Sequence, residues 1–146
     1  MKYTLKYSIT LFLFFSLFCC TQHTKQTPIT YLEKKYQVRI TPHIKKIYLV
    51  DENKISCGPC LNEFLHYLTQ KQPTQQELIL LNNTGTFINH NLFQNKACTI
   101  IQYKPKLNAL DSLLPSLGII YVTNGTLDSV VHVTPTNIQQ VIAQDG

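Results

Sequence analysis

Apolar residues recur along this chain in two different patterns, which predict alternating strands and helices. Residues 45–51 (KKIYLVD) are rich in β-branched, aromatic and aliphatic side chains, which is typical of a strand. After Cys60 the spacing changes to that of a helix with one apolar face, because four apolar residues fall at i, i+3, i+4 and i+7: Leu61, Phe64, Leu65 and Leu68. This helix is expected to end before Pro73. Residues 77–81 (ELILL) form a continuous apolar run, which favours a strand buried on both faces of a sheet.

The same patterns continue to the end of the chain. We expect further strands at residues 37–40, 97–103, 118–122 and 127–133, and helical segments at residues 89–94, 107–114 and 137–144, the last capped by Thr136. Asn124 and Gly125 form an Asn-Gly pair, which predicts a hairpin between the final two strands. Strands alternating with helices indicate an α/β fold of three layers, in which helices flank a central mixed sheet.

The N-terminus has a different character from the rest of the chain. Two lysines precede a mostly apolar run of 12 residues from Ile9 to Cys20, and polar residues follow at once. That length is typical of the hydrophobic part of a signal peptide, whereas a membrane-spanning helix needs about 20 apolar residues. The sequence therefore predicts export, and an uncleaved, weakly anchoring apolar segment is the alternative.

The end of this apolar run resembles the signal of a bacterial lipoprotein. Leu17 stands at the leading position of that motif, Cys19 takes the place of its small residue, and Cys20 stands where the lipidated cysteine is found. The resemblance implies a signal peptide at residues 1–19, a lipidated Cys20 with a polar tether over residues 20–37, and a folded domain over residues 38–146. It also implies a periplasm-facing membrane location.

Charge excludes one class of partner. The formal net charge is +5, and no run of basic residues is longer than two. Such a chain lacks the basic stripe with which proteins follow a nucleic-acid backbone. We therefore expect no nucleic-acid partner.

The candidate chemistry lies in the stretch SCGPC, where Cys57 and Cys60 are separated by Gly58 and Pro59. In an exported protein such a pair is a redox dithiol, a structural disulfide or half of a metal site. Structural zinc needs four ligands, and the sequence has no second cysteine pair, so we expect no metal. Cys98 lies in an apolar strand and is expected to be a buried, unreactive thiol.

The position of the pair favours redox chemistry. Cys57 falls where a loop turns into the predicted helix, and a helix N-terminus stabilises a thiolate with its free N–H groups and dipole. Cys60 lies one turn inside the helix and is expected to be more buried. Pro59 is compatible with the first turn of a helix, and Gly58 with a close backbone approach.

These residues together resemble the active-site region of thioredoxins, and the resemblance covers roughly residues 40–146. CGPC is the thioredoxin motif, and in LVDENKISCGPC the acid Asp51 stands where thioredoxins carry a buried proton relay. CGPCLNEF is similar to the exported, membrane-anchored TlpA/ResA-like thioredoxins, whose glutamate corresponds to Glu63. In LLPSLGIIYVTNG the family's cis-proline beside the dithiol would be Pro115. Ser56 replaces the tryptophan that usually precedes the first cysteine.

The resemblance implies a thioredoxin-like fold and a protein-disulfide reductase that uses no cofactor. Cys57 would attack substrate disulfides, Cys60 would resolve the mixed disulfide, and Asp51 would handle the proton. Its partners would be disulfide-containing proteins and a membrane thiol-electron donor. Two alternatives remain open: a redox-inert scaffold lipoprotein with a closed disulfide, and a chaperone for a soft metal ion such as copper(I).

Overall fold

The structure, a computed structural model, describes residues 27–82, 89–93, 98–101 and 109–146. The expected signal peptide at residues 1–19 and the expected lipidation site Cys20 lie outside these ranges. The described helices, 3₁₀ turns and strands are, in chain order, α2 (Pro28–Tyr36), β1 (Lys46–Asp51), η1 (Glu52–Lys54), α3 (Gly58–Gln70), β2 (Glu77–Asn82), η2 (His90–Phe93), β3 (Cys98–Ile101), α4 (Ala109–Leu113), β4 (Leu117–Thr123), β5 (Thr126–His132) and α5 (Ile138–Asp145).

The five strands form one mixed sheet in the order β3-β2-β1-β4-β5. β1 pairs in parallel with β2, which pairs in parallel with β3, whereas β4 runs antiparallel to both β1 and β5. The parallel half comes from strands linked through helices, and the antiparallel half ends in the β4–β5 hairpin. In that hairpin Asn124 and Gly125 have φ angles of 52° and 76°, as a tight turn with an Asn-Gly pair requires. The predicted hairpin is confirmed.

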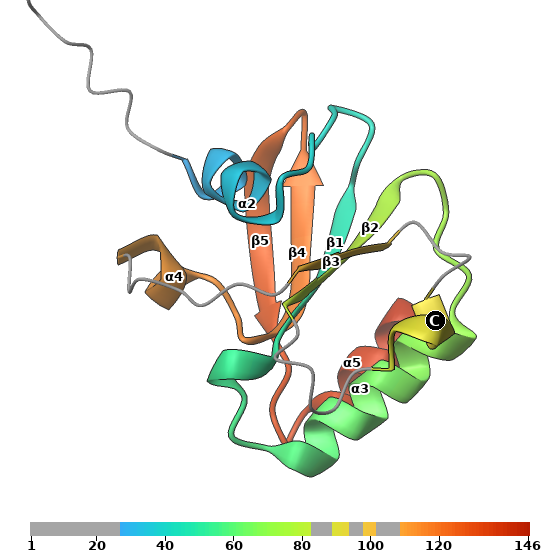
Figure 1. The fold of residues 1–146 in the computed structure, drawn as a ribbon. Helices are drawn as coiled ribbons and strands as arrows, with labels where there is room; N and C mark the ends of the chain where they lie inside the picture. The colour runs from blue at the N-terminus through green and yellow to red at the C-terminus, as the bar shows by residue number, and fades with distance from the viewer. Residues whose placement is uncertain (1–26, 83–88, 94–97, 102–108) are drawn as a thin grey trace, which may run out of the picture.

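One face of the sheet packs against α3 and α5. Tyr48 and Val50 of β1 point to this side, where they meet Phe64 and Leu68 of α3 and Val141 of α5 in one buried cluster. Figure 1 shows α3 and α5 lying side by side along this face. The helical spacing from Leu61 to Leu68 predicted this arrangement, because it places all its apolar residues on one side of α3.

The other face packs against α2 and α4. Ile47 and Leu49 of β1 alternate with the residues of the first face and join Leu32 and Tyr36 of α2, with Leu110 of α4 against them. Figure 1 shows α2 and α4 on this side of the sheet, away from α3 and α5. The sheet is thus covered on both faces. The predicted α/β class, with a central mixed sheet between two helical layers, is confirmed.

The tether expected over residues 20–37 is wrong for its second half, because residues 28–36 form helix α2. Thr27 caps this helix by accepting a hydrogen bond from the Thr30 N–H, and Pro28 occupies the first turn. Leu32 and Tyr36 are almost wholly buried. The Thr-Pro pair and the apolar i, i+4 spacing are helix signals that were present in the sequence. The folded domain therefore begins by residue 28 and not at residue 38.

The short strand expected at residues 37–40 is also wrong. Gln37 ends α2 in the left-handed conformation, with φ 52° and ψ 38°. The Ile40 N–H then donates to the Glu33 carboxylate at 2.8 Å. Because a side chain of the preceding helix binds this backbone donor, the segment turns back onto α2 and pairs with no described strand.

The remaining expected elements are found within one to three residues of their predicted bounds. The helix expected at residues 89–94 is the 3₁₀ turn η2, and the strand expected at residues 97–103 is β3 over its described part. α5 begins one residue later than expected, so that Asn137 and not Thr136 takes the N-cap position. Within the described ranges, no helix is long and apolar enough to cross a membrane.

A buried polar cluster fastens α5 to the end of the sheet far from the cysteines. The Asp145 carboxylate accepts hydrogen bonds from the hydroxyls of Tyr48 at 2.6 Å and Tyr67 at 2.5 Å, and pairs with Lys46. Burial alone would raise the pKa of Asp145, but the bonds from Lys46 and the two tyrosines outweigh it and lower that pKa. The carboxylate is therefore charged at neutral pH and joins α5 to β1 and α3.

If α2 belongs to the folded domain, Leu32→Ala should destabilise it by about 2–5 kcal/mol, because a fully buried leucine is truncated. Lys34→Ala is the matched control, since Lys34 lies exposed on the same helix and should change stability by less than about 0.5 kcal/mol. Denaturant unfolding of residues 21–146 measures both. Equal stability of the two variants would show that α2 does not contribute to the core.

Asp145→Asn should lower the free energy of unfolding at pH 7 by about 1–3 kcal/mol, because charged hydrogen bonds are lost. Since the pKa of Asp145 is lower in the folded state, its contribution is present above the unfolded value of about 3.9. This contribution to the free energy of unfolding is lost as the pH falls through the pKa of Asp145 in the folded state. The difference between wild type and variant should therefore shrink below about pH 4. Asp128→Asn, on exposed β5, is the control; equal losses in both variants would contradict the role of Asp145.

Candidate functional site

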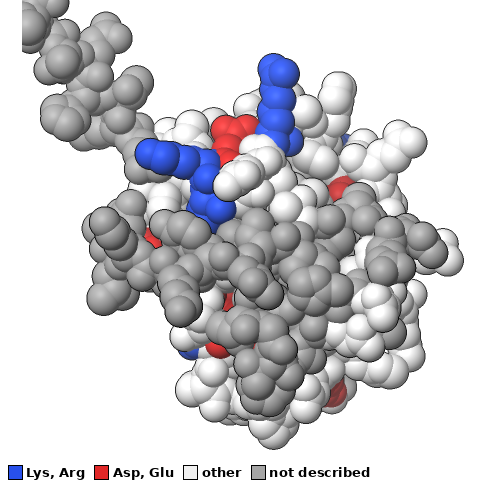
Figure 2. Space-filling model, in the orientation of Figure 1, with Lys and Arg blue, Asp and Glu red and all other residues white. Residues whose placement is uncertain are grey.

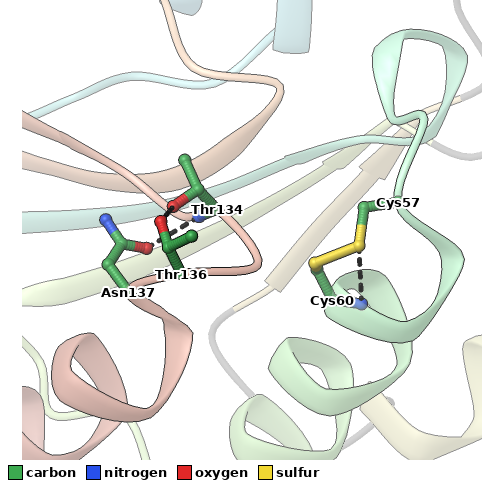
Figure 3. Close-up of a disulfide and its surroundings, with 5 residues drawn as sticks. All are labelled: Cys57, Cys60, Thr134, Thr136 and Asn137. Carbon is green, nitrogen blue, oxygen red and sulfur yellow. Dashed lines mark hydrogen bonds between the residues drawn. A yellow bond between two sulfur atoms is a disulfide. The ribbon is translucent and has the colours of Figure 1, made fainter.

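The two cysteines of the CGPC motif form a disulfide at the start of α3. Cys57 and Cys60 are bonded to each other, with their Cα atoms 5.4 Å apart, within the usual range of about 4.4–6.8 Å. Cys60 is only 4% exposed, whereas Cys57 is half-buried. Figure 3 shows the sulfur bridge at the first turn of the helix. Cys57 is therefore the more accessible cysteine of the pair, as the sequence predicted.

The local sequence explains why the helix begins at this pair. Cys57 is the N-cap of α3, and its sulfur lies 3.3 Å from the Cys60 nitrogen, whose N–H points to it. Pro59 lies in the first turn of α3, where a backbone N–H would have no partner within the helix, so the N–H that proline lacks costs no hydrogen bond. Once the disulfide is reduced, the same free N–H groups stabilise a Cys57 thiolate. A Cβ added to Gly58 would meet no atom within 4 Å, so the close backbone approach expected there is not found.

Asp51 ends β1 and is buried, with 1% of its surface exposed. Its Oδ1 accepts a hydrogen bond of 2.8 Å from Asn82 on the neighbouring strand β2, and its Oδ2 one of 2.9 Å from Lys35 on α2. Val50, the residue before it, points to the α3 side, so the Asp51 side chain points to the α2 side. Within the described residues, no hydrogen bond or ion pair joins it to either cysteine. Its role as proton relay stays a prediction.

Lys35 connects Asp51 to a second buried carboxylate. The ammonium group lies 2.9 Å from Asp51 Oδ2 and 3.1 Å from Asp111 Oδ1, and all three side chains are at most 4% exposed. It also lies 5.9 Å and 5.7 Å from the ring centres of Tyr31 and Tyr36, on its own helix. These rings provide a cation–π environment that offsets part of the lost hydration. Lys35 therefore pairs with both the carboxylate at the end of β1, Asp51, and the carboxylate on α4, Asp111.

Lys54 supplies the second cation of this cluster. It donates 2.9 Å and 3.1 Å hydrogen bonds to the Oδ1 and backbone oxygen of Asp111, and lies 3.8 Å from Asp51 Oδ2. Burial raises the pKa of Asp111, but hydrogen bonds from Lys54, Tyr31 and Lys35 lower it to about 2. Asp111 is therefore ionised at neutral pH. Two lysines and two carboxylates leave the cluster with no formal net charge.

Pro115 lies in the buried turn between α4 and β4, directly beside the end of β1. The Asp51 N–H donates to the carbonyl of the next residue, Ser116, at 2.6 Å. A Cβ on Gly118 would lie 2.9 Å from the Pro115 Cβ and 2.2 Å from the Val131 oxygen, so this packing requires glycine. No peptide bond among the described residues is cis, so the cis-proline expected at Pro115 is wrong. The turn nevertheless brings Pro115 next to Asp51.

Glu63 lies one turn beyond Cys60 on α3, on the side that faces α5. Its Oε1 accepts a hydrogen bond from the Gln139 side chain of α5. This contact joins the helix that carries the disulfide to the last helix. The structure thus gives Glu63 a helix–helix contact, and its expected functional role stays a prediction.

The loop between β5 and α5 carries polar groups, of which sequence analysis named only Thr136, as the cap of the last helix. The Asn137 Oδ1 accepts a 2.7 Å hydrogen bond from the Thr134 N–H, and the hydroxyls of Thr134 and Thr136 lie 3.0 Å apart. Figure 3 shows this loop among the surroundings of the disulfide. The Thr-Pro-Thr-Asn sequence is a turn signal, but it gives no indication of which distant residues it faces.

Lys35, Lys54, Asn82 and Asp111 are the other residues that sequence analysis missed. Lys35 lies between Leu32 and Tyr36, so a helix over residues 28–36 would have placed it beside the apolar face. Neither Lys54 nor Asp111 carries any local signal, because they are separated by 57 positions and meet only through the fold. Asn82 is paired with Asp51 across two parallel strands.

Other candidate sites add little to this arrangement. Cys98 begins the edge strand β3, and its side chain lies outside the described part. Among the described residues, no three His, Cys, Asp or Glu side chains are grouped so that they could hold a metal ion. The face drawn in Figure 2 carries acidic side chains beside its few basic ones, so its described part presents no continuous basic stripe.

The arrangement is chemically capable of thiol–disulfide exchange. An accessible sulfur lies at a helix N-terminus, a buried sulfur lies one turn behind it, and a buried carboxylate ends the strand that leads into their loop. Comparisons with protein-family models, with curated proteins and with solved structures find no match for this chain.

Proposed function

We propose that this chain is an exported, lipid-anchored thiol-disulfide oxidoreductase with a thioredoxin-like fold. The observation that carries the proposal is the unequal burial of two bonded cysteines at a helix N-terminus. Cys57 is half-buried and Cys60 is 4% exposed. This difference suits a pair in which one sulfur meets the substrate while the other stays protected until the second step.

The sheet supports the proposed fold. The dithiol follows the central strand β1, which is flanked by parallel β2 and antiparallel β4. Helices cover both faces, and α3, which carries the pair, lies on the same face as α5. This arrangement is compatible with the resemblance drawn from CGPC, Asp51 and Pro115.

In the proposed reaction the reduced protein acts in two exchange steps. The Cys57 thiolate attacks a substrate disulfide, forming a mixed disulfide and releasing one substrate thiolate, which takes up a proton. Cys60 then loses its proton, for which Asp51 is the proposed acceptor, and attacks the Cys57 sulfur. The mixed disulfide breaks, the second substrate thiol leaves, and the Cys57–Cys60 disulfide forms. Two electrons pass from the protein to the substrate.

The oxidised protein needs a dithiol reductant for the next cycle, and we propose a membrane thiol-electron donor. Anchoring through a lipid on Cys20 would hold the domain close to such a donor. Reduction by the donor reverses the two exchange steps, so that the same sulfurs serve both partners. No cofactor takes part in the proposed cycle.

Cys57→Ser should reduce the rate of disulfide reduction by residues 21–146 to the uncatalysed background, because no thiolate remains to attack. Cys60→Ser should instead accumulate a mixed disulfide with the substrate, since the resolving thiol is missing. Reduction of insulin in the presence of dithiothreitol measures the first effect, and mass spectrometry of the non-reduced protein measures the second.

Cys98→Ser is the matched control and should keep the wild-type rate. A wild-type rate in Cys57→Ser would refute the proposed function. A wild-type disulfide that does not exchange with glutathione or dithiothreitol at all would favour the redox-inert scaffold.

Asp51→Asn should slow the second exchange step by about tenfold or more, because the proposed proton acceptor is removed. The release of the second substrate thiol in a single turnover measures this step, and the first step should change much less. Asp128→Asn, an exposed substitution of the same kind, should change neither. An unchanged second step in a folded Asp51→Asn protein would remove Asp51 from the mechanism.

A further inference from the structure

The loop that carries Cys57 is joined by Lys54 to a distant helix, α4. This loop, residues 52–57, leaves β1 after Asp51 and contains η1, whose last residue is Lys54. The Lys54 ammonium donates to Asp111 Oδ1 at 2.9 Å and to the Asp111 carbonyl at 3.1 Å. Lys54 stands three residues before Cys57, so this contact restrains the approach of the chain to the disulfide.

Asp111 is itself buried and pairs with a second cation. Its side chain is 3% exposed, and Lys35 of α2 lies 3.1 Å from the same Oδ1 that binds Lys54. The anchor is therefore a buried carboxylate fixed between a helix and the loop. An ion pair with such low exposure is much less screened than one at the surface.

We propose that Asp111 is a positioning residue for the redox pair, which holds the Cys57 loop through Lys54 and thereby stabilises the Cys57–Cys60 disulfide relative to the dithiol. The inference rests on the proposed function, since it concerns the same sulfurs. Asp111 touches neither cysteine and acts through Lys54. The low pKa of Asp111, about 2, supports the geometry, because the anchor stays charged across the pH range in which thiols exchange.

The direction of the effect follows from the entropy of ring closure. A disulfide between two thiols forms more readily when both are already held close together, because less freedom is lost on bonding. A loosened loop lets Cys57 sample more positions after reduction and so favours the dithiol. In the exchange with glutathione, the protein disulfide and two glutathione molecules give the protein dithiol and one glutathione disulfide. Loss of the anchor should move this equilibrium toward the dithiol.

Positioning and simple charge effects make opposite predictions for one variant. Asp111→Asn removes a negative charge and loosens the loop, and both changes favour the reduced form with its Cys57 thiolate. Lys54→Met removes a positive charge, which by electrostatics alone disfavours that thiolate and favours the disulfide. If Lys54 acts by holding the loop, Lys54→Met favours the dithiol instead. Lys54→Met is therefore the decisive variant.

The experiment equilibrates residues 21–146 with glutathione redox buffers at pH 7 and measures the reduced fraction by alkylation and mass spectrometry. Asp111→Asn and Lys54→Met should both shift the equilibrium constant about three- to tenfold toward the dithiol. The double variant should show less than the sum of the two single shifts, because both substitutions weaken the same ion pair between Lys54 and Asp111. Lys54→Arg should restore a value close to wild type, since charge and donors are retained.

Asp128→Asn and Lys34→Met are matched controls of exposed charges, and neither should shift the constant measurably. A shift of Lys54→Met toward the disulfide, or no shift in either Lys54→Met or Asp111→Asn, would overturn the inference while leaving the proposed function intact. A wild-type pair that does not exchange would instead overturn the proposed function. If Asp111→Asn fails to fold, as judged by circular dichroism, Lys54→Met alone decides, because Lys54 is 23% exposed and more tolerant of substitution.

Discussion

The fold and its chemistry both depend on one buried lysine. Lys35 brings its ammonium group between Asp51 and Asp111, where neither carboxylate is more than 3% exposed. Without this cation Lys54 alone would face two buried carboxylates, and the uncompensated negative charge would cost several kcal/mol. Helix α2 supplies Lys35, so it stabilises the buried carboxylate at the end of β1 just as the neighbouring strands stabilise its backbone. This is why the domain includes a segment whose composition is that of a linker.

The same cluster connects the two faces of the sheet. Asp51 and Asp111 lie on the face covered by α2 and α4, whereas the cysteines lie on the face covered by α3 and α5. The loop of residues 52–57 crosses from one face to the other, and Lys54 is fastened on the first face just before the chain reaches Cys57. Under the proposed positioning role, a change in the α2 layer reaches the disulfide through the segment from Lys54 to Cys57.

The parts of the fold that sequence analysis predicted correctly are those whose signals are local. The apolar spacing from Leu61 to Leu68 and the Asn124-Gly125 turn each specify their structure within a few residues. α2 was missed because polar composition outweighed a short helical pattern. The prediction of a strand at residues 37–40 was wrong because the Ile40 N–H donates its hydrogen bond to the Glu33 side chain and not to a neighbouring strand. Such side-chain contacts to the backbone leave no periodic pattern in a sequence.

The candidate site likewise has a part that local sequence signals predicted and a part that they did not. The pairing of Cys57 with Cys60, their position at a helix N-terminus and their unequal burial all follow from CGPC and the helix after it, and all were predictable. The contacts that hold the loop before the pair were not, because Lys35 and Asp111 come from distant parts of the chain and meet this loop only through the fold. Redox properties depend on both parts: the local motif provides two thiols that are able to exchange, and the distant charges and contacts determine how readily they do so. On the proposal made for Asp111, two proteins with the same CGPC motif differ in reduction potential when the contacts that hold their loops differ.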